Sequence, residues 1–151
     1  MTWVCKRAGT VDIELDVPEI VGKGRPRFTR LGKPYTPAKT AIAERIVREG
    51  FAEAAGDRYA DFTGPVSISV KATRELARSN PKDWAGRTDM MKPDIDNVLK
   101  LVLDALNGIA YHDDSQVIFT TASKGSRTPR GTGNKLHITV RYYSETRRGK
   151  Q

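Results

Sequence analysis

Cysteine is almost absent from this sequence, which has one residue, Cys5, in 151. A single thiol excludes an internal disulfide and a metal site built from several thiolates. Long apolar runs are missing as well, since none approaches the roughly 18 residues that a membrane-spanning helix needs. No sustained apolar stretch follows Lys6 and Arg7, so the N-terminus does not resemble a secretory signal. We therefore expect a cytoplasmic protein without a membrane-spanning segment.

Acidic residues are also few, 18 against 26 lysines and arginines, which gives a formal charge of +8 and a pI of about 9.8. Such a chain attracts polyanions, and nucleic acid is favoured over a membrane because no basic amphipathic anchor is present. Residues 22–40 contain six bases and no acid, and residues 124–151 contain eight bases and one acid. Residues 94–114, by contrast, contain five aspartates and one base, Lys100. An acidic segment thus interrupts a basic protein.

The apolar spacing predicts a single compact domain, because a chain of this length fits one hydrophobic core. Apolar residues alternate where strands are expected and recur at helical spacing where helices are expected. The predicted elements are strands at 11–17, 66–70, 116–122 and 135–143 and helices at 37–55 and 94–107. Their order, β-α-β-α-β-β, predicts an α+β fold in which the helices pack on one face of a mixed sheet. We also expect a basic loop at 22–37 and a frayed tail at 145–151.

The second predicted helix has an apolar face and a polar face. Asp96, Lys100 and Asp104 are spaced by four and therefore line its polar face. Asp94 stands at its N-terminal edge, and we expect no binding role for Asp104. The helix-loop-strand connection that follows is long enough to return the adjacent aspartates at 113–114 toward Asp94. The carboxylates are therefore expected at one site.

Three converging carboxylates require a cation or protonation. At a separation of ~4 Å each pair repels by roughly 4 kcal/mol at an effective dielectric constant of about 20, which is large beside a net stability of about 5–15 kcal/mol. Oxygen ligands without histidine or cysteine favour Mg²⁺, with Mn²⁺ as a substitute, over zinc. Such a cation polarises a phosphate and activates water, and Lys100 can stabilise the charge that develops. The pattern predicts a site for phosphodiester hydrolysis.

The same residues also have plain structural explanations. Asp94 is a suitable N-cap residue, and Asp96 in the first turn interacts favourably with the helix dipole. Asp113 and Asp114 can form a turn before the next strand. Lys100 can simply be a solvated lysine. The residues alone leave these explanations open.

The region from Lys92 to Val117 contains a specific set of motifs. They read Lys92-Pro-Asp-Ile-Asp-Asn-Val-Leu-Lys100, then Asp104-Ala-Leu-Asn107, then Asp113-Asp-Ser-Gln-Val117. Upstream stand Gly24-Arg-Pro-Arg-Phe-Thr-Arg30 and Tyr35-Thr-Pro37. Together these motifs, which span most of the chain, resemble the RusA family of Holliday junction resolvases.

The resemblance implies a homodimeric, Mg²⁺-dependent endonuclease that acts in DNA recombination and repair, is often encoded by prophages, and resolves four-way junctions by paired nicks. By motif position, Asp94, Asp96 and Asp114 correspond to the metal ligands, and Lys100 corresponds to the lysine required for cleavage. Asp113 is a secondary candidate. We expect no nucleotide cofactor.

Basic residues near the motifs are expected to contact the phosphates of branched DNA. We assign this role to Lys23, Arg25, Arg27, Arg30 and Lys92. Some family members carry arginine directly before the first aspartate, where this chain has Pro93, so Lys92 is the nearest base. Phe28 is expected to pack against its own domain, with stacking on an unpaired base as the alternative.

Two alternative functions stay open at this point. One is a nuclease that prefers forks, flaps or other branched DNA. The other is a basic DNA-binding module without catalysis, in which the acidic segment is only a capped helix and a turn. A dimer suits a four-way junction, because the junction has approximate two-fold symmetry and a chain with one site can cut one strand at a time.

Overall fold

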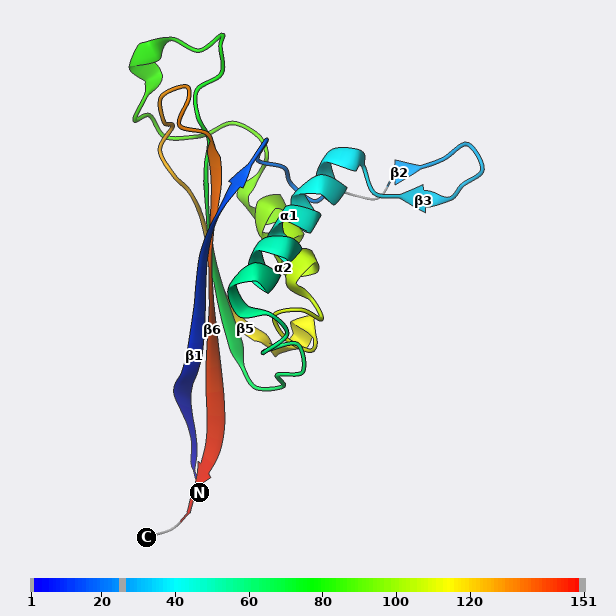
Figure 1. Ribbon diagram of the computed structural model, residues 1–151, viewed down its shortest axis with the longest axis vertical. Helices are drawn as coiled ribbons and strands as arrows, with labels where there is room; N and C mark the ends of the chain where they lie inside the picture. The colour runs from blue at the N-terminus through cyan, green and yellow to red at the C-terminus, as the bar shows by residue number, and fades with distance from the viewer. Residues whose placement is uncertain (1, 25–26, 150–151) are drawn as a thin grey trace.

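The computed structural model describes residues 2–24 and 27–149 and has two helices on one face of a four-stranded sheet (Figure 1). The strand order is β1-β6-β4-β5. β4 and β5 are parallel, and the other neighbours are antiparallel. The strands are β1 (Thr2–Val17), β4 (Val66–Thr73), β5 (Val117–Lys124) and β6 (Asn134–Arg148), and the helices are α1 (Ala38–Ala55) and α2 (Ile95–Leu106). The predicted α+β class and the order of the main elements are confirmed.

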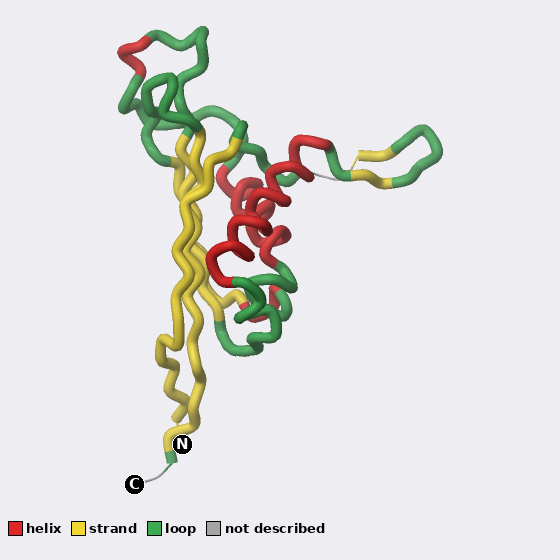
Figure 2. The backbone as a smooth tube through the Cα atoms, viewed as in Figure 1, coloured by secondary structure: helices red, strands yellow, loops and turns green. Residues whose placement is uncertain are grey.

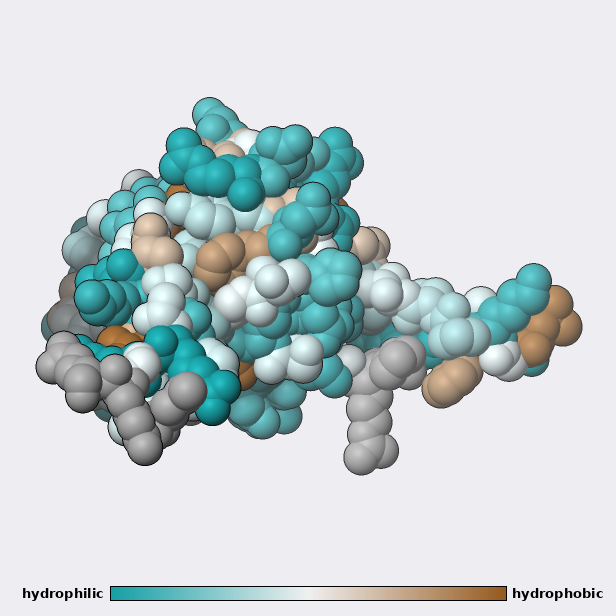
Figure 3. Space-filling model, turned by 90° about the horizontal axis from the view of Figure 1, so that it is seen from below, coloured by the Kyte–Doolittle hydropathy of each residue, from teal (hydrophilic) through white to brown (hydrophobic). Residues whose placement is uncertain are grey.

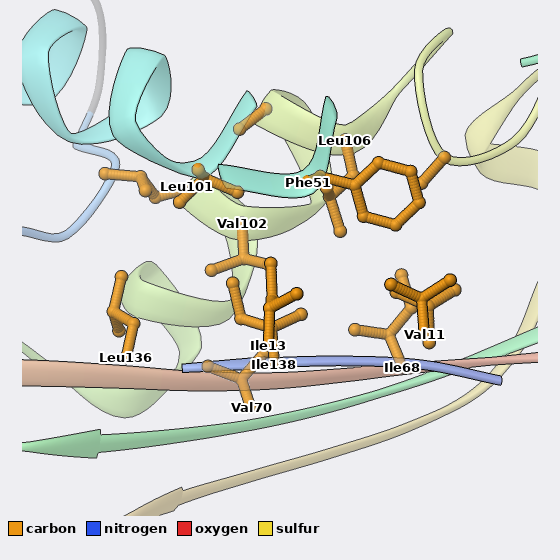
Figure 4. Packing of buried hydrophobic residues seen from close by; sticks show 14 of the residues in the cluster. Val11, Ile13, Phe51, Ile68, Val70, Leu101, Val102, Leu106, Leu136 and Ile138 are labelled. Carbon is orange, nitrogen blue, oxygen red and sulfur yellow. The ribbon is translucent and has the colours of Figure 1, made fainter. Parts of the chain in front are cut away.

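The hydrophobic core lies between the sheet and the two helices (Figure 4). α2 turns its apolar face to the sheet, and Leu101, Val102 and Leu106 are fully buried there. From the sheet, Ile68 and Ile138 meet this face. Because burial of the apolar stripe fixes the rotation of α2, the polar face with Asp96 and Lys100 points to solvent.

Two short strands form a hairpin within the predicted basic loop. β2 (Arg27–Phe28) pairs with β3 (Pro34–Tyr35) in a separate two-stranded sheet. We call residues 27–35 the arm, because they project away from the sheet and helices (Figure 1). The sequence predicted no strands here, since two-residue strands with exposed side chains leave no apolar pattern.

The strands at the two ends of the chain are longer than predicted. β1 starts at Thr2, and β6 continues to Arg148, so the predicted frayed tail at 145–151 is wrong as far as Arg148. The two strands pair from Thr2↔Arg148 to Val17↔Asn134 and extend past the helices as a two-stranded ribbon (Figure 2). The side chains at this end of the ribbon are mostly exposed, so backbone pairing alone defines it and the sequence shows no alternation.

The turns between the elements include two short 3₁₀ helices, η1 (Lys82–Trp84) and η2 (Asp114–Gln116). η1 belongs to a lobe at one end of the sheet, formed by the segment after β4 and the segment before β6 (Figure 1). η2 lies between α2 and β5 and contains Asp114. Within the described ranges, no helix is long and apolar enough to cross a membrane.

Candidate active site

Asp94 and Asp96 lie at the start of α2. Asp94 occupies the N-cap position, but its side chain makes no capping hydrogen bond. Asp96 is exposed and accepts a hydrogen bond from the backbone N–H of Asn97 at 3.0 Å. The capping explanation therefore fails for the Asp94 side chain, and both carboxylates face solvent at the same end of the helix.

The second aspartate pair divides into one structural and one less engaged residue. Asp113 caps η2: its Oδ2 accepts from the Ser115 N–H at 3.0 Å, and Gln116 Oε1 accepts from the Asp113 N–H at 2.8 Å. The turn explanation is therefore correct for Asp113. Asp114 instead buries its Oδ1 with no hydrogen-bond partner in the described part of the protein. An unpaired buried carboxylate oxygen is costly and is suited to a ligand.

The surroundings of Asp114 make its ionised form less favourable. Burial raises its pKa, and a hydrogen bond from Tyr111 lowers it, while the charges of Asp104 and Asp113 raise it further. The net pKa lies above the ordinary value of an aspartate. Tyr111 itself is fully buried and donates its hydroxyl to the Leu103 carbonyl at 3.1 Å. Tyr111 thereby holds Asp114 beside the C-terminal half of α2.

One chain does not bring all the predicted ligands together. Asp94 and Asp96 lie at the N-terminal end of α2, whereas Asp114 lies near Asp104 and Leu103. Ten residues of α-helix separate Asp94 from Asp104, which is about 15 Å. Among residues 2–24 and 27–149, no group of three or more His, Cys, Asp or Glu side chains is placed to hold one metal ion. The expected convergence within a single chain is therefore not found.

The start of the predicted basic loop packs directly against the first turn of α2. A Cβ on Gly22 would lie 2.7 Å from the Asn97 Cβ, so only glycine allows this approach. The next residue, Lys23, donates its backbone N–H to the Asn97 carbonyl at 2.9 Å. The path of the loop is thus fixed beside Asp94 and Asp96.

Lys23 has a structural role that differs from the predicted phosphate contact. Its Nζ lies 2.5 Å from Glu44 Oε1 on α1 and 3.3 Å from Asp104 Oδ2 on α2. Partial burial lowers the pKa of Lys23, but hydrogen bonds and charge from the two carboxylates outweigh this effect and raise it. Because two carboxylates balance its charge, Lys23 joins the loop to both helices, and Asp104 has a partner that the sequence did not predict.

The arm carries exposed cations and exposed apolar side chains. Phe28 is 66% exposed and Leu31 is 88% exposed, so the expectation that Phe28 packs against its own domain is wrong. Arg27 and Arg30 are also exposed. Figure 3 shows the arm standing clear of the body with apolar surface at its end. Arg25, which was assigned to DNA as well, lies outside the described residues.

Three of these findings depend on tertiary contacts that carry no sequence signal. Tyr111 fits an apolar pattern, yet its hydroxyl positions Asp114. The Lys23 ion pairs join residues far apart in the chain, so their spacing reveals nothing. Lys100 does lie as predicted, exposed on the same face of α2 as Asp96. Lys92 is exposed just before the start of α2.

Comparisons with known proteins agree with these motifs. The family model "Endodeoxyribonuclease RusA" matches residues 18–141, which include α1, α2 and both aspartate pairs. The chain is also similar to the uncharacterized protein YqaN of Bacillus subtilis (strain 168), with 37% identity over 117 residues, covering 70% of this chain and 81% of YqaN. The chain therefore belongs to the RusA family of endodeoxyribonucleases.

Proposed function

We propose that this protein is a Mg²⁺-dependent endonuclease that resolves four-way DNA junctions by paired phosphodiester cleavage. The observation that carries the proposal is the buried, unpartnered Oδ1 of Asp114 within a chain of the RusA family. Asp94, at an N-cap position without a capping hydrogen bond, adds a second carboxylate with no structural task at that cap. A membrane or nucleotide ligand would not require these acids.

Asp94, Asp96 and Asp114 would hold the cation. Their carboxylate oxygens are the hard donors that Mg²⁺ and Mn²⁺ prefer, and the unpartnered Asp114 Oδ1 fits this use. When bound, such a cation polarises the phosphate, lowers the pKa of the attacking water and stabilises the departing oxygen. Lys100, exposed one turn after Asp96, supplies a positive charge toward the phosphate or the leaving oxygen.

A homodimer accounts for the separation of the ligands within one chain. Asp94 and Asp96 belong to one end of α2, and Asp114 belongs to the other. A two-fold axis that sets α2 against its copy head to tail brings the Asp96 end of one chain to the Asp114 end of its partner. Each dimer then has two equivalent sites, as the paired cleavage of a two-fold symmetric junction requires.

The arm supplies part of the DNA contact in this proposal. Arg27, Arg30 and Lys33 are exposed on it, and the described arm contains no acid. Phosphate contacts of this kind give affinity that falls with salt, and they position the protein without reading sequence. The exposed ring of Phe28 is available to stack on an unpaired base at the crossover.

The proposed function is tested by nicking of synthetic DNA with and without Mg²⁺. We expect paired nicks in a four-way junction when Mg²⁺ is present, and none in excess EDTA. Three-way junctions and linear duplexes serve as controls and are expected to be cut much more slowly. If linear duplex is cut as readily as the junction, the protein is not a resolvase. Binding without cleavage under any of these conditions would show a DNA-binding module instead.

Lys23 and Arg27 separate structural from DNA-binding charge, because they lie in the same loop and lose the same charge on replacement by glutamine. Lys23→Gln leaves Glu44, which is nearly buried, short of a partner and is expected to reduce the free energy of unfolding by about 1–3 kcal/mol. Arg27→Gln is expected to leave stability unchanged. In junction binding, Arg27→Gln should reduce the slope of log K against log salt by about 0.9.

Chemical denaturation and binding at several salt concentrations measure the two effects. Lys23→Gln should leave the salt slope unchanged. The wild-type contribution of Lys23 should also be complete below the ordinary lysine pKa and be lost as the pH rises through its raised folded value. A reduced salt slope in Lys23→Gln would return that residue to the DNA interface.

A further inference from the structure

A pocket of about 530 Å³ lies beside the start of α2 and is separate from the arm. Asp94 and Asn97 form one wall, and the segment between β1 and the arm forms a second. The lobe contributes Leu76 and Arg127, from the segments that follow β4 and precede β6. One of the proposed metal ligands, Asp94, therefore faces a cavity large enough for part of a nucleotide.

Arg127 is a buried cation in the wall of this pocket. It is only 8% exposed, and its Nη2 donates to the Glu75 carbonyl at 2.9 Å and to Asn80 Oδ1 at 3.1 Å. Both acceptors are neutral groups. Its Nε is buried with no acceptor among the described residues, and Arg127 forms no ion pair with any of them. A buried guanidinium in this state is expected to bind an anion, since an unpaired buried charge is costly.

The other charged side chains of the pocket are mostly engaged. Arg74 makes a bidentate ion pair with Asp89 at 2.6 and 2.7 Å. Lys39 pairs with Glu19 at 3.2 Å. Glu75 is also engaged, because its Oε2 accepts from two backbone N–H groups of the lobe at 2.7 and 2.9 Å.

Lys92 is the second cation that remains free in the pocket. It lies two residues before Asp94, is exposed, and has no ion pair with another described residue. Arg127 and Lys92 are thus the two uncompensated positive charges of the pocket, on walls that meet at Asp94. An anion between them would satisfy both.

We infer that this pocket binds a backbone phosphate of the cleaved DNA strand next to the phosphate that is cut. The inference rests on the proposed function, because a strand that brings one phosphate to Asp94 carries the next phosphate one nucleotide away. The planar guanidinium of Arg127 matches the geometry of a phosphate, and Lys92 adds a mobile point charge. Such a contact carries no sequence information, but it fixes the register of the strand and so selects which bond is cut.

Neutral phosphates test this assignment. Junctions with a single methylphosphonate at each position around the cut are bound to protein that carries Asp96→Asn, so that the DNA stays intact. One position adjacent to the cut is expected to weaken binding by about tenfold, the effect of one charge-assisted hydrogen bond. In protein that also carries Arg127→Gln, the methylphosphonate at that position should have little further effect, because the two changes remove the same contact.

Arg130→Gln is the matched control. Arg130 lies in the same lobe and donates to the Arg78 carbonyl at 2.9 Å, but it is exposed and does not line this pocket. It should show no coupling to any methylphosphonate next to the cut. Thermal melting checks that Arg127→Gln is folded. If it is not, Lys92→Gln, a change on an exposed side chain, is used in its place and must show the same coupling.

The outcomes distinguish this inference from the proposed function. Coupling of Arg127 or Lys92 to one adjacent phosphate supports the pocket as a phosphate site. Additive effects at every position, together with normal junction cleavage by the wild-type protein, overturn the phosphate site and leave the function intact. Absence of cleavage by the wild-type protein overturns the proposed function itself.

Discussion

Replacement of Asp96 by asparagine is expected to slow junction cleavage by at least about a hundredfold while junction binding is retained or tightened. Asparagine keeps the size of the side chain but removes the charge that binds a cation. Loss of metal-based stabilisation is worth several kcal/mol in the transition state, and each 1.36 kcal/mol is a factor of ten in rate. Binding should not weaken, because a negative charge beside the DNA is removed.

Single-turnover cleavage and equilibrium binding of the same labelled junction measure the two effects. Asp57→Asn is the matched control, because Asp57 is an exposed aspartate just after α1. It should cleave at the wild-type rate. Full activity in Asp96→Asn would remove this residue from the metal site, and weaker binding without a loss of rate would assign it to DNA recognition.

Replacement of Asp114 by asparagine is expected to abolish cleavage to a similar extent and, in EDTA, to raise the melting temperature. Burial raises the pKa of Asp114 in the folded protein, so its ionised form destabilises the fold at neutral pH. Asparagine removes that charge and leaves the Tyr111 hydroxyl bonded to Leu103. The residue would thus be kept for function at a cost in stability.

The pH dependence has a defined sign. The destabilisation by Asp114 is complete above its raised folded pKa, and it decreases as the pH falls through that value toward the ordinary aspartate pKa. The stability advantage of Asp114→Asn in EDTA should therefore shrink on acidification. Added Mg²⁺ should stabilise the wild-type protein, because a ligand that binds the folded state raises its stability, and it should not stabilise the variant. A variant less stable than wild type in EDTA at neutral pH would contradict this account of Asp114.

Local patterns predicted the main elements because each has its own periodicity. The apolar stripe of α2 faces one side of the helix, and the structure buries that side against the sheet. Its polar face, with Asp96 and Lys100, followed from the same pattern. Where residues are exposed on both sides, as at the outer ends of β1 and β6, the pairing partner alone defines the strand. No pattern within one segment could reveal those ends.

The geometry of the candidate site was predicted less well. The motifs identified Asp94, Asp96 and Asp114, but the position of Asp114 depends on the packing of Tyr111 against α2. Sequence spacing therefore did not reveal that the carboxylates of one chain lie at opposite ends of this helix. The same holds for Arg127, whose burial depends on contacts between two segments about 50 residues apart in the chain.

Mixing two inactive variants tests most directly whether the carboxylates from the two ends of α2 meet around one cation across a dimer. One chain carries Asp96→Asn and the other carries Asp114→Asn. In a shared site, each mixed dimer has one site with both changes and one with neither. An equal mixture that exchanges subunits should therefore recover about a quarter of the wild-type sites and nick the junction, which neither variant does alone. Mixed dimers that form but do not nick would contradict the shared site.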